Sequence, residues 1–449
     1  MNLENDIIGV KASSLLLPAK SVDLVKWSVV ACDQYTSQPE YWAEAAKISN
    51  NDPSILNLIY PEVYLNEDPK KKDARIAAIN NAMGAYINSD ILVEHEPGFI
   101  YVDRKTAHVK SRKGLVLTVD LEKYDFSKGS QSLIRATEKT VVERIPPRLR
   151  IREKAPLEAS HIMLLIDDPE KTVIEPLAEM MDKIDKLYDF ELMLNSGHLA
   201  GCKVTDPEQI SGIFEALEAL ADTDSFRKKY GVKADKGVLL FAVGDGNHSL
   251  ATAKTHWENV KKTLKGEALD RHPARYALVE VVNVHDEGLQ FEPIHRVVFN
   301  IDPDQMLKAM VNYYDKNGMK ASYKYFDAPE DRNKTPKSKS AHVIPFIATG
   351  NLGEITVENS KFNLEVATLQ DFLDAFLKDH AGSEIDYIHG TDVVEKLGRT
   401  QGNIGFFLPA MDKNQLFRTV ILDGTLPRKT FSMGEADEKR FYLECRKIV

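Results

Sequence analysis

The stretch that most constrains the fold of this chain is an uncharged apolar run that ends in a glycine-rich turn. Residues 238–243 read Val-Leu-Leu-Phe-Ala-Val, and Gly-Asp-Gly-Asn-His follows at 244–248. A short apolar run bounded by turn residues is typical of a strand buried on both faces. Gly244 and Gly246 permit backbone angles that other residues resist, so we expect a sharp turn. Apolar residues then recur at helical spacing, which predicts a helix: Leu250, Ala253, Trp257 and Val260.

The predicted turn would present an acid, an imidazole and backbone amides at the start of that helix. Asp245, Asn247 and His248 lie in the turn, and either Ser249 or Asn247 can cap the helix. A helix N-terminus favours negative charge because its first amides lack partners within the helix and its dipole points there. The turn is therefore a candidate anion site. The alternative is an ordinary tight turn with His248 on the surface.

Several short motifs, distributed along most of the chain, resemble those of a known protein family. In order they are Tyr101–Arg104, Arg135–Thr140, Asp245–Ser249, Pro293–Val298, Ile385–His389 and Leu426–Thr430. Together they resemble the DUF1015 family, in which the third motif reads Asp-Gly-His-His-Arg. This motif is in turn similar to the phosphate-binding turn of the ParB/sulfiredoxin-like superfamily. Members of that superfamily bind nucleotides and include partitioning CTPases, sulfiredoxin and free-serine kinases.

The chain departs from the family motif at two positions of the turn. Asn247 replaces a histidine, and Ser249 stands where the motif has an arginine that would hold phosphate directly. Lys254, just over one helical turn beyond Ser249, can supply the missing charge. Asn247 also occupies the place of the reactive cysteine of sulfiredoxin, which disfavours that chemistry.

Arginines are dense between residues 132 and 152, and they include Arg135 and Arg144. Their planar donors can clamp phosphate or carboxylate. The alternative is that these arginines lie on a solvent-exposed surface and form ion pairs with neighbouring acidic side chains. The resemblance to the family places Arg135 and Glu138 in the site. It also makes His295 and Arg296, which follow Pro293, contributors to the site.

Composition excludes several classes of protein. The 449 residues carry a formal net charge of −10, which argues against a broad nucleic-acid interface. No apolar run approaches the ~20 residues needed to cross a bilayer. The first residues lack the apolar core of a signal peptide. The three cysteines are too scattered for a disulfide framework or a cysteine zinc site. We therefore expect a reduced, cytoplasmic protein with no nucleic-acid or membrane partner.

Alternating strand and helix patterns predict a mixed α/β (α+β) fold. We expect an N-terminal subdomain at 1–110, a ParB/sulfiredoxin-like core at 111–300 and a C-terminal α/β subdomain at 301–449. Residues 25–32 read as a strand that ends at Asp33, and residues 327–340 read as an exposed loop. Asp-Pro pairs at 68, 206 and 302 predict three helix starts.

These features favour a nucleotide-binding phosphotransferase that acts on a small hydroxyl metabolite such as a serine-like compound. Phosphoryl transfer needs charge neutralisation and a base near the acceptor hydroxyl. Asp245 or Glu138 would orient the acceptor or hold Mg²⁺, and His248 with Ser249 and the amides after Gly246 would hold phosphate. The expected ligand is a phosphate-containing small molecule such as ATP, ADP or CTP. The alternatives are a non-catalytic nucleotide- or metabolite-binding regulator and a metal-dependent phosphohydrolase. The sequence leaves the oligomeric state open.

Overall fold

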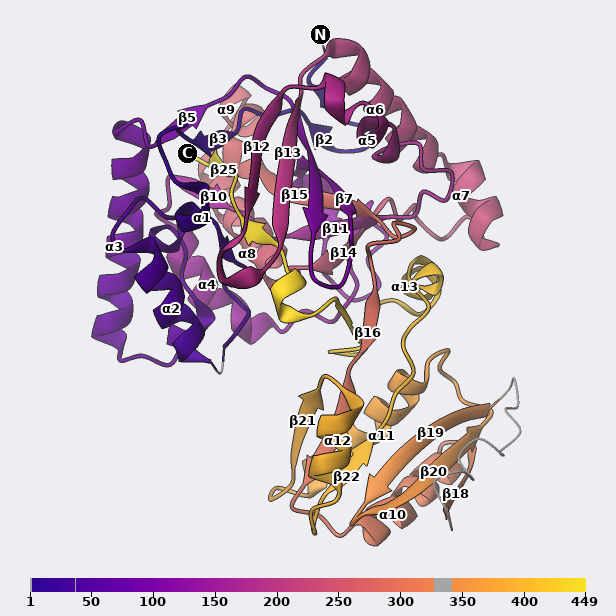
Figure 1. Cartoon of the computed structure of the whole chain (residues 1–449). Helices are drawn as coiled ribbons and strands as arrows, with labels where there is room; N and C mark the ends of the chain where they lie inside the picture. Colours follow the sequence, from indigo (N-terminus) through magenta and orange to yellow (C-terminus); the bar gives the residue numbers. More distant parts are fainter. Residues whose placement is uncertain (1, 37, 327–340) are drawn as a thin grey trace. The chain divides into compact units, whose positions relative to one another are not determined.

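The computed structural model describes residues 2–36, 38–326 and 341–449. The predicted loop at 327–340 lies outside the described residues. The chain divides into two compact units, residues 1–290 with 433–449 and residues 291–432. Each unit combines sheets with helices, as Figure 1 shows, so the mixed α+β class expected from the sequence is confirmed.

An eleven-stranded mixed sheet organises the first unit. Its main path runs β12 (Lys186–Glu191), β13 (His198–Val204), β6 (Phe99–Lys105), β7 (Arg112–Asp120), β15 (Tyr276–Asn283), β11 (Met163–Ile166), β14 (Phe241–Asp245), β9 (Ile134–Ala136) and β8 (Tyr124–Asp125). The short strands β1 (Glu4–Asn5) and β2 (Val10–Lys11) join it through β7. Residues on both sides of position 110 share this sheet. The compact division therefore falls after 290 and again after 432, not at the boundary expected near 110.

Two smaller sheets complete the strands of the first unit. One has the order β10 (Leu157–Ala159), β25 (Cys445–Lys447), β3 (Leu16–Pro18) and β5 (Leu92–Glu94). The other pairs β4 (Val29–Val30) with β24 (Phe441–Tyr442). The last residues of the chain therefore pair with strands near its beginning.

Helices cover the sheets of the first unit. They are α1 (Leu24–Trp27), α2 (Pro39–Ser49), α3 (Pro69–Asn88), α4 (Ile145–Arg152), α5 (Glu175–Glu179), α6 (Pro207–Leu220), α7 (Thr223–Tyr230), α8 (Asn247–Val260) and α9 (Glu267–Arg271). None of the helices in the described part of the chain is both long and apolar enough to cross a membrane.

The second unit has a six-stranded antiparallel sheet with its own core. The strand order is β18 (Lys320–Tyr325), β20 (Asn351–Glu358), β19 (Ala341–Ala348), β22 (Ile404–Phe406), β17 (His295–Phe299) and β21 (Glu384–Ile388). Its helices are α10 (Pro303–Lys316), α11 (Glu365–Asp379), α12 (Thr391–Gly398) and α13 (Leu416–Asp423). The short strands β16 (Phe291–Pro293) and β23 (Phe431–Met433) also pair.

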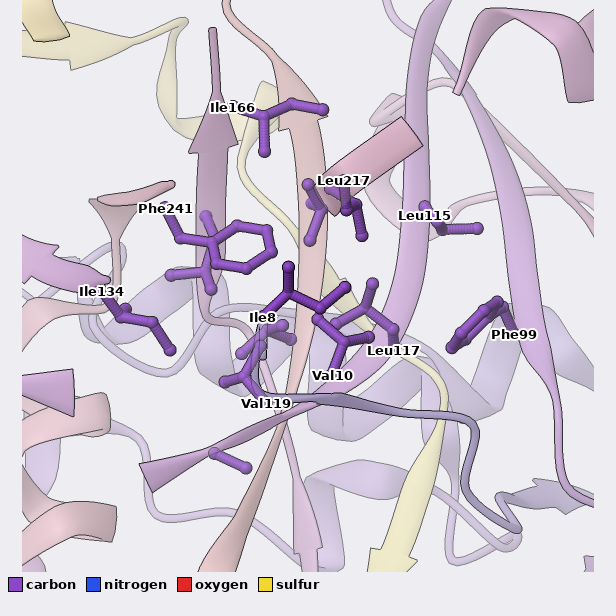
Figure 2. Packing of buried hydrophobic residues seen from close by; sticks show 14 of the residues in the cluster. Ile8, Val10, Phe99, Leu115, Leu117, Val119, Ile134, Ile166, Leu217 and Phe241 are labelled. Atoms are coloured by element: carbon purple, nitrogen blue, oxygen red, sulfur yellow. The ribbon is translucent and has the colours of Figure 1, made fainter. Parts of the chain in front are cut away.

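The large sheet is buried on both faces, and strand alternation assigns its side chains to two cores. Leu115, Leu117 and Val119 of β7 belong to the core drawn in Figure 2, whereas Val116 belongs to the core on the other face. Phe241 joins the first of these cores and has no exposed surface. The run before the glycine-rich turn therefore contains the predicted buried strand, but β14 begins only at Phe241, and residues 238–240 are not part of a strand.

Short polar signals set several helix starts. Asp68, Asp206 and Asp302 each accept a hydrogen bond from an amide in the first turn of α3, α6 and α10, and a proline follows each. The three Asp-Pro predictions are confirmed because proline fits the first helical turn and aspartate caps it. The strand predicted at 25–32 is wrong in its first half. The Asp23 side chain caps the short helix α1 there, and β4 covers Val29–Val30 alone.

Candidate functional site

The glycine-rich turn joins β14, an inner strand of the large sheet, to α8. β14 lies between β11, which runs antiparallel to it, and β9, which runs parallel. Gly246 has a φ of 78°, and an added Cβ would lie 3.0 Å from the Cα atom of Ile162. Glycine is therefore required at this position both by its backbone angle and by the close approach of a neighbouring chain. The predicted order of strand, sharp turn and helix is confirmed, but Gly244 and Asp245, which were expected in the turn, belong to β14.

The first turn of α8 has no side-chain cap. Gly246 is the N-cap residue, and neither Asn247 nor Ser249 caps the helix, so the capping predicted for them is wrong. The hydroxyl of Ser249 instead approaches a histidine of a neighbouring segment. The side-chain oxygen of Asn247 is buried and has no hydrogen-bond partner among the described residues. The helix start thus has no side-chain cap from its N-cap residue and keeps the positive dipole end that favours an anion.

Asp245 forms an ion pair at the end of β14. Its Oδ2 atom lies 3.3 Å from Nζ of Lys439, and its Oδ1 atom accepts a hydrogen bond of 2.8 Å from the Gly246 amide. Burial raises the pKa of Asp245, but the ammonium group of Lys439, the nearby His161 and the Gly246 hydrogen bond together outweigh it and hold this pKa below its ordinary value. Asp245 is therefore an ionised carboxylate and a weak base at neutral pH.

His161 is the centre of a polar cluster beside this turn. Its Nε2 atom lies 3.3 Å from Oγ of Ser249 and 3.8 Å from Oδ2 of Asp33. Its Nδ1 atom lies 2.6 Å from the hydroxyl of Tyr442. The side chain of His161 is 5% exposed, whereas that of Asp33 is 29% exposed. The imidazole thus connects a buried tyrosine with a carboxylate and a hydroxyl that solvent can reach.

Pairing between the two ends of the chain positions this cluster. β4 pairs with β24, and the Ala31 amide donates to the Arg440 carbonyl at 2.9 Å. The Cys32 amide then donates to the hydroxyl of Tyr442 at 3.3 Å. Burial raises the pKa of Tyr442 well above its ordinary value, so this hydroxyl keeps its proton. Asp33 is therefore held at the site by contacts with residues far along the chain.

The segment after β9 contacts the turn from the other side. The Thr137 hydroxyl donates to the Val243 carbonyl at 2.6 Å, and the Val141 amide donates to Nε2 of His248 at 3.2 Å. Nε2 of His248 is therefore an acceptor, which places the proton of the neutral ring on Nδ1. Glu138 is half-buried in the same segment. The structure thus brings the predicted Glu138 segment and the predicted turn into direct contact.

Two of the three arginines predicted for the site, Arg135 and Arg144, lie in other surroundings. The buried guanidinium of Arg135 donates to the carbonyls of Ser132, at 2.8 Å, and Gly237. Gly237 precedes β14, whereas the turn follows it, so these contacts lie at the opposite end of the strand. Burial lowers the pKa of Arg135 to about 10. Arg144 is exposed in the short 3-10 helix Val142–Arg144.

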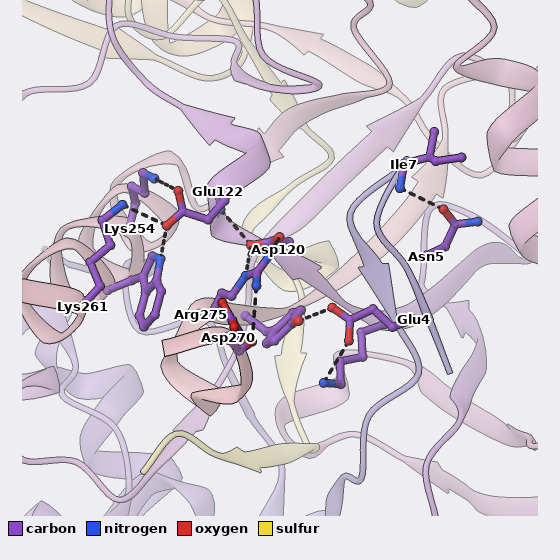
Figure 3. A network of polar contacts seen from close by, with 12 residues as sticks. Glu4, Asn5, Ile7, Asp120, Glu122, Lys254, Lys261, Asp270 and Arg275 are labelled. Carbon is purple, nitrogen blue, oxygen red and sulfur yellow. Dashed lines mark hydrogen bonds and ion pairs between the residues drawn. The ribbon is translucent and has the colours of Figure 1, made fainter. Parts of the chain in front are cut away.

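Lys254 is held by carboxylates along α8. Its Nζ atom lies 2.7 Å from Oε1 of Glu258 and 3.9 Å from Oε2 of Glu122. Figure 3 shows Lys254 and Lys261 directed toward Glu122. These carboxylates hold Lys254 along α8, whereas Lys439, which is itself paired with Asp245, is the lysine that the structure places at the turn.

His295 and Arg296 belong to β17 in the second unit, where both side chains are buried. Nδ1 of His295 accepts from the Leu408 amide at 3.0 Å. Nη2 of Arg296 donates to the Arg428 carbonyl at 3.0 Å, and its guanidinium lies 4.9 Å from the centre of the Tyr387 ring. These contacts hold strands and loops of the second unit together.

A metal ion at this site would need ligands from a bound phosphate as well as from the carboxylates near the turn. Across the described residues, no group of three or more His, Cys, Asp or Glu side chains is arranged to hold a metal by itself. Mg²⁺ commonly binds through one or two carboxylates together with phosphate oxygens. Asp33 fits that role because it is partly exposed, whereas Lys439 already lies against Oδ2 of Asp245.

Sequence reasoning missed Asp33, His161, Lys439 and Tyr442 as site residues. Asp33 had a usable signal, since it follows an uncharged run as Asp245 does. The other three had none. They reach the turn only through pairing of distant strands, such as β4 with β24 and β11 with β14.

Comparison with known proteins gives a family and distant structural relatives. Among solved structures, a free serine kinase in complex with AMP is 11% identical, with a TM-score of 0.37 over 74% of this chain and 91% of that chain. A conserved hypothetical protein from Pyrococcus furiosus is 11% identical, with a TM-score of 0.35 over 73% and 90% of the two chains. None of the curated proteins compared matches the chain. The family model DUF1015, described as a protein of unknown function, matches residues 16–376. Because this match covers most of the sequence, the chain belongs to the DUF1015 family.

Proposed function

We propose that this protein is a nucleotide-dependent phosphotransferase that passes a phosphoryl group to the hydroxyl of a small metabolite, such as a serine-like compound. One observation carries the proposal. Lys439, His161 and Asp33 come from three distant segments and converge on the uncapped start of α8. Such a start attracts phosphate, and the cluster around it supplies the cation and the proton acceptor that phosphoryl transfer needs.

The phosphate groups would lie at the first turn of α8. Its backbone amides and the hydroxyl of Ser249 are the donors, and Lys439 contributes positive charge at the same end of β14. The side chain of Lys439 is 11% exposed, so water screens its charge less than that of a surface lysine. The proposal retains a ParB/sulfiredoxin-like phosphate-binding turn, with His248 among the groups that would hold phosphate and Glu138 as a group that would orient the acceptor. Asp245 holds Lys439 in place by ion pairing.

The proton of the acceptor hydroxyl would go to Asp33 or, through it, to His161. In the transfer, the acceptor oxygen forms a bond to the terminal phosphorus, and the bond from that phosphorus to the bridging oxygen breaks. The bridging oxygen leaves with the electron pair, and the acceptor proton moves to the carboxylate. Asp33 suits this task because it is partly exposed and its Oδ2 atom faces the imidazole of His161 at 3.8 Å. Bound Mg²⁺ would neutralise charge on the phosphates by binding their oxygens.

Label transfer distinguishes this proposal from the two alternatives. The protein is incubated with terminally labelled ATP or ADP and a panel of small hydroxyl compounds that includes serine, with and without Mg²⁺. Label that appears in a hydroxyl compound supports a phosphotransferase. Release of free phosphate supports a metal-dependent phosphohydrolase, and saturable binding without turnover supports a regulator.

A matched pair of variants tests the proposed proton acceptor. Asp33→Asn removes the carboxylate but keeps its shape, and we expect transfer to fall by at least a hundredfold, as is typical for loss of a general base. Asp52→Asn is the control, since Asp52 forms a surface ion pair with Lys26. Equal rates for Asp33→Asn and the parent protein would rule out Asp33 as the base.

A further inference from the structure

A pocket of about 490 Å³ lies between α2, α3 and the loop that joins them. Its volume is within the range of sites that bind small molecules. Aromatic and apolar side chains dominate the lining, among them Trp42, Ile59, Tyr64, Ile79 and Tyr86. The pocket lies wholly within the first unit.

The electrostatics of this pocket favour an uncharged flat ligand. Among the described residues that line it, Arg75 alone carries a charge. Nη2 of Arg75 lies 2.6 Å from Oε1 of Glu67, so this charge is already balanced. The guanidinium also lies 4.0 Å from the centre of the Tyr64 ring, which adds a planar surface to the lining. A phosphate or carboxylate would find no free cation here, whereas a heteroaromatic ring would find stacking surfaces.

Two routes of residue contacts lead from the lining of the pocket to the segment that contains Asp33. Pro61 lines the pocket, and the amide of the next residue, Glu62, donates to the Cys32 carbonyl at 2.8 Å, immediately before Asp33. In the other route, Trp42 packs edge-on against Tyr41 at 5.5 Å, and Tyr41 stacks on Tyr35 at 3.8 Å. Tyr35 has a φ of 51°, an unfavourable angle that is common near functional sites.

We propose that this pocket binds the base of the nucleotide, whose phosphates extend past Asp33 to the start of α8. The inference rests on the proposed function and adds the position of the base and the chemistry that recognises it. Bases stack on aromatic side chains whatever their identity, because every base has an aromatic face. The lining therefore favours binding of the base over discrimination among bases.

A pair of tryptophan substitutions on α3 tests the proposal. Ala78 lines the pocket and is exposed, so Ala78→Trp fills the pocket without disturbing the core. Ala77 is also exposed but lies outside the lining, about 100° further round the helix, so Ala77→Trp is the matched control. The binding of ADP, CDP and inorganic pyrophosphate to the full-length chain is measured by calorimetric titration for both variants and the parent protein.

We expect Ala78→Trp to weaken the binding of ADP and CDP at least tenfold and to leave pyrophosphate binding within twofold of the parent. Ala77→Trp should change neither. Unchanged nucleotide affinity in Ala78→Trp would overturn the pocket proposal but leave the proposed function standing. Equal loss of nucleotide and pyrophosphate binding would also overturn it. A parent protein that binds neither nucleotide would contradict the proposed function itself, and the pocket proposal with it.

A second variant tests the proposal independently, in case Ala78→Trp does not fold. Tyr64→Leu keeps an apolar side chain in the lining but removes the ring on which Arg75 stacks. It should weaken the binding of ADP and CDP severalfold, again with pyrophosphate affinity unchanged. Nucleotide affinity equal to that of the parent in this variant would count against base binding.

Discussion

Oγ of Ser249 lies 3.3 Å from Nε2 of His161, although 88 residues separate them in the sequence. Ser249 is the third residue of α8, too far into the helix to be its N-cap, and its hydroxyl approaches the imidazole instead. The hydroxyl faces the polar cluster, and the first turn of α8 has no side-chain cap. The same contact places an imidazole and, through it, Asp33 at the turn.

The conformation of Gly246 gives a stability prediction. Gly246→Ala should destabilise the protein by about 2–3 kcal/mol, because alanine resists a positive φ and its Cβ would press on Ile162. Gly212→Ala, within α6, is the control, since an added Cβ meets nothing within 4 Å there. This control should stabilise the protein by about 0.5–1 kcal/mol. Urea denaturation measures both, and equal effects would contradict the description of the turn.

The pair between Lys439 and Asp245 predicts a pH dependence. The pKa of Asp245 is lower in the folded protein than in the unfolded chain, so its stabilising contribution is present above the ordinary aspartate pKa of about 3.9 and is lost as the pH falls through the folded value. Lys439→Met removes the ion-pair partner. The loss of stability should be largest near neutral pH and shrink as the solution is acidified.

The check is a set of urea denaturation curves from about pH 7 down to about pH 3 for the parent and Lys439→Met. Lys447→Met is a suitable control because its pair with Glu94 is exposed and contributes little. A difference between the parent and Lys439→Met that stays constant with pH would show that Asp245 and Lys439 do not interact.

A buried ion network near the end of the chain gives a third prediction. Arg440 pairs with Glu280 and with Glu444, and all three side chains are at most 5% exposed. Arg440→Met should cost about 3–5 kcal/mol, because it leaves two carboxylates buried without their partner. Arg150→Met, which breaks an exposed pair with Asp73, should cost less than about 1 kcal/mol. Thermal and urea unfolding compare the two variants, and similar losses would refute the burial argument.

Local signals in the sequence predicted local structure well. The Asp-Pro pairs located three helices, because capping and proline geometry act within a few residues. The uncharged run before Gly244 likewise predicted β14 and the turn after it. The strand predicted at 25–32 failed because the Asp23 cap favours a helical turn that the apolar pattern does not reveal.

The contacts at the site between residues far apart in the chain could not be predicted from the sequence. His161, Lys439 and Tyr442 meet only after distant strands pair. The sequence also could not tell which charges are already neutralised. Lys254 was expected to hold phosphate, yet Glu258 and Glu122 lie against it, because helical spacing brings Glu258 there and the 3-10 helix Leu121–Lys123 brings Glu122.

The central claim is that the start of α8, with Lys439 beside it, binds the phosphates of a nucleotide. Calorimetric titration of ADP into the parent, Lys439→Met and Lys254→Met tests it most directly, since the two lysines differ in position but not in chemistry. We expect Lys439→Met to weaken binding at least tenfold and Lys254→Met to stay within twofold of the parent. Equal affinity of the parent and Lys439→Met for ADP, or a larger loss in Lys254→Met, would contradict the claim.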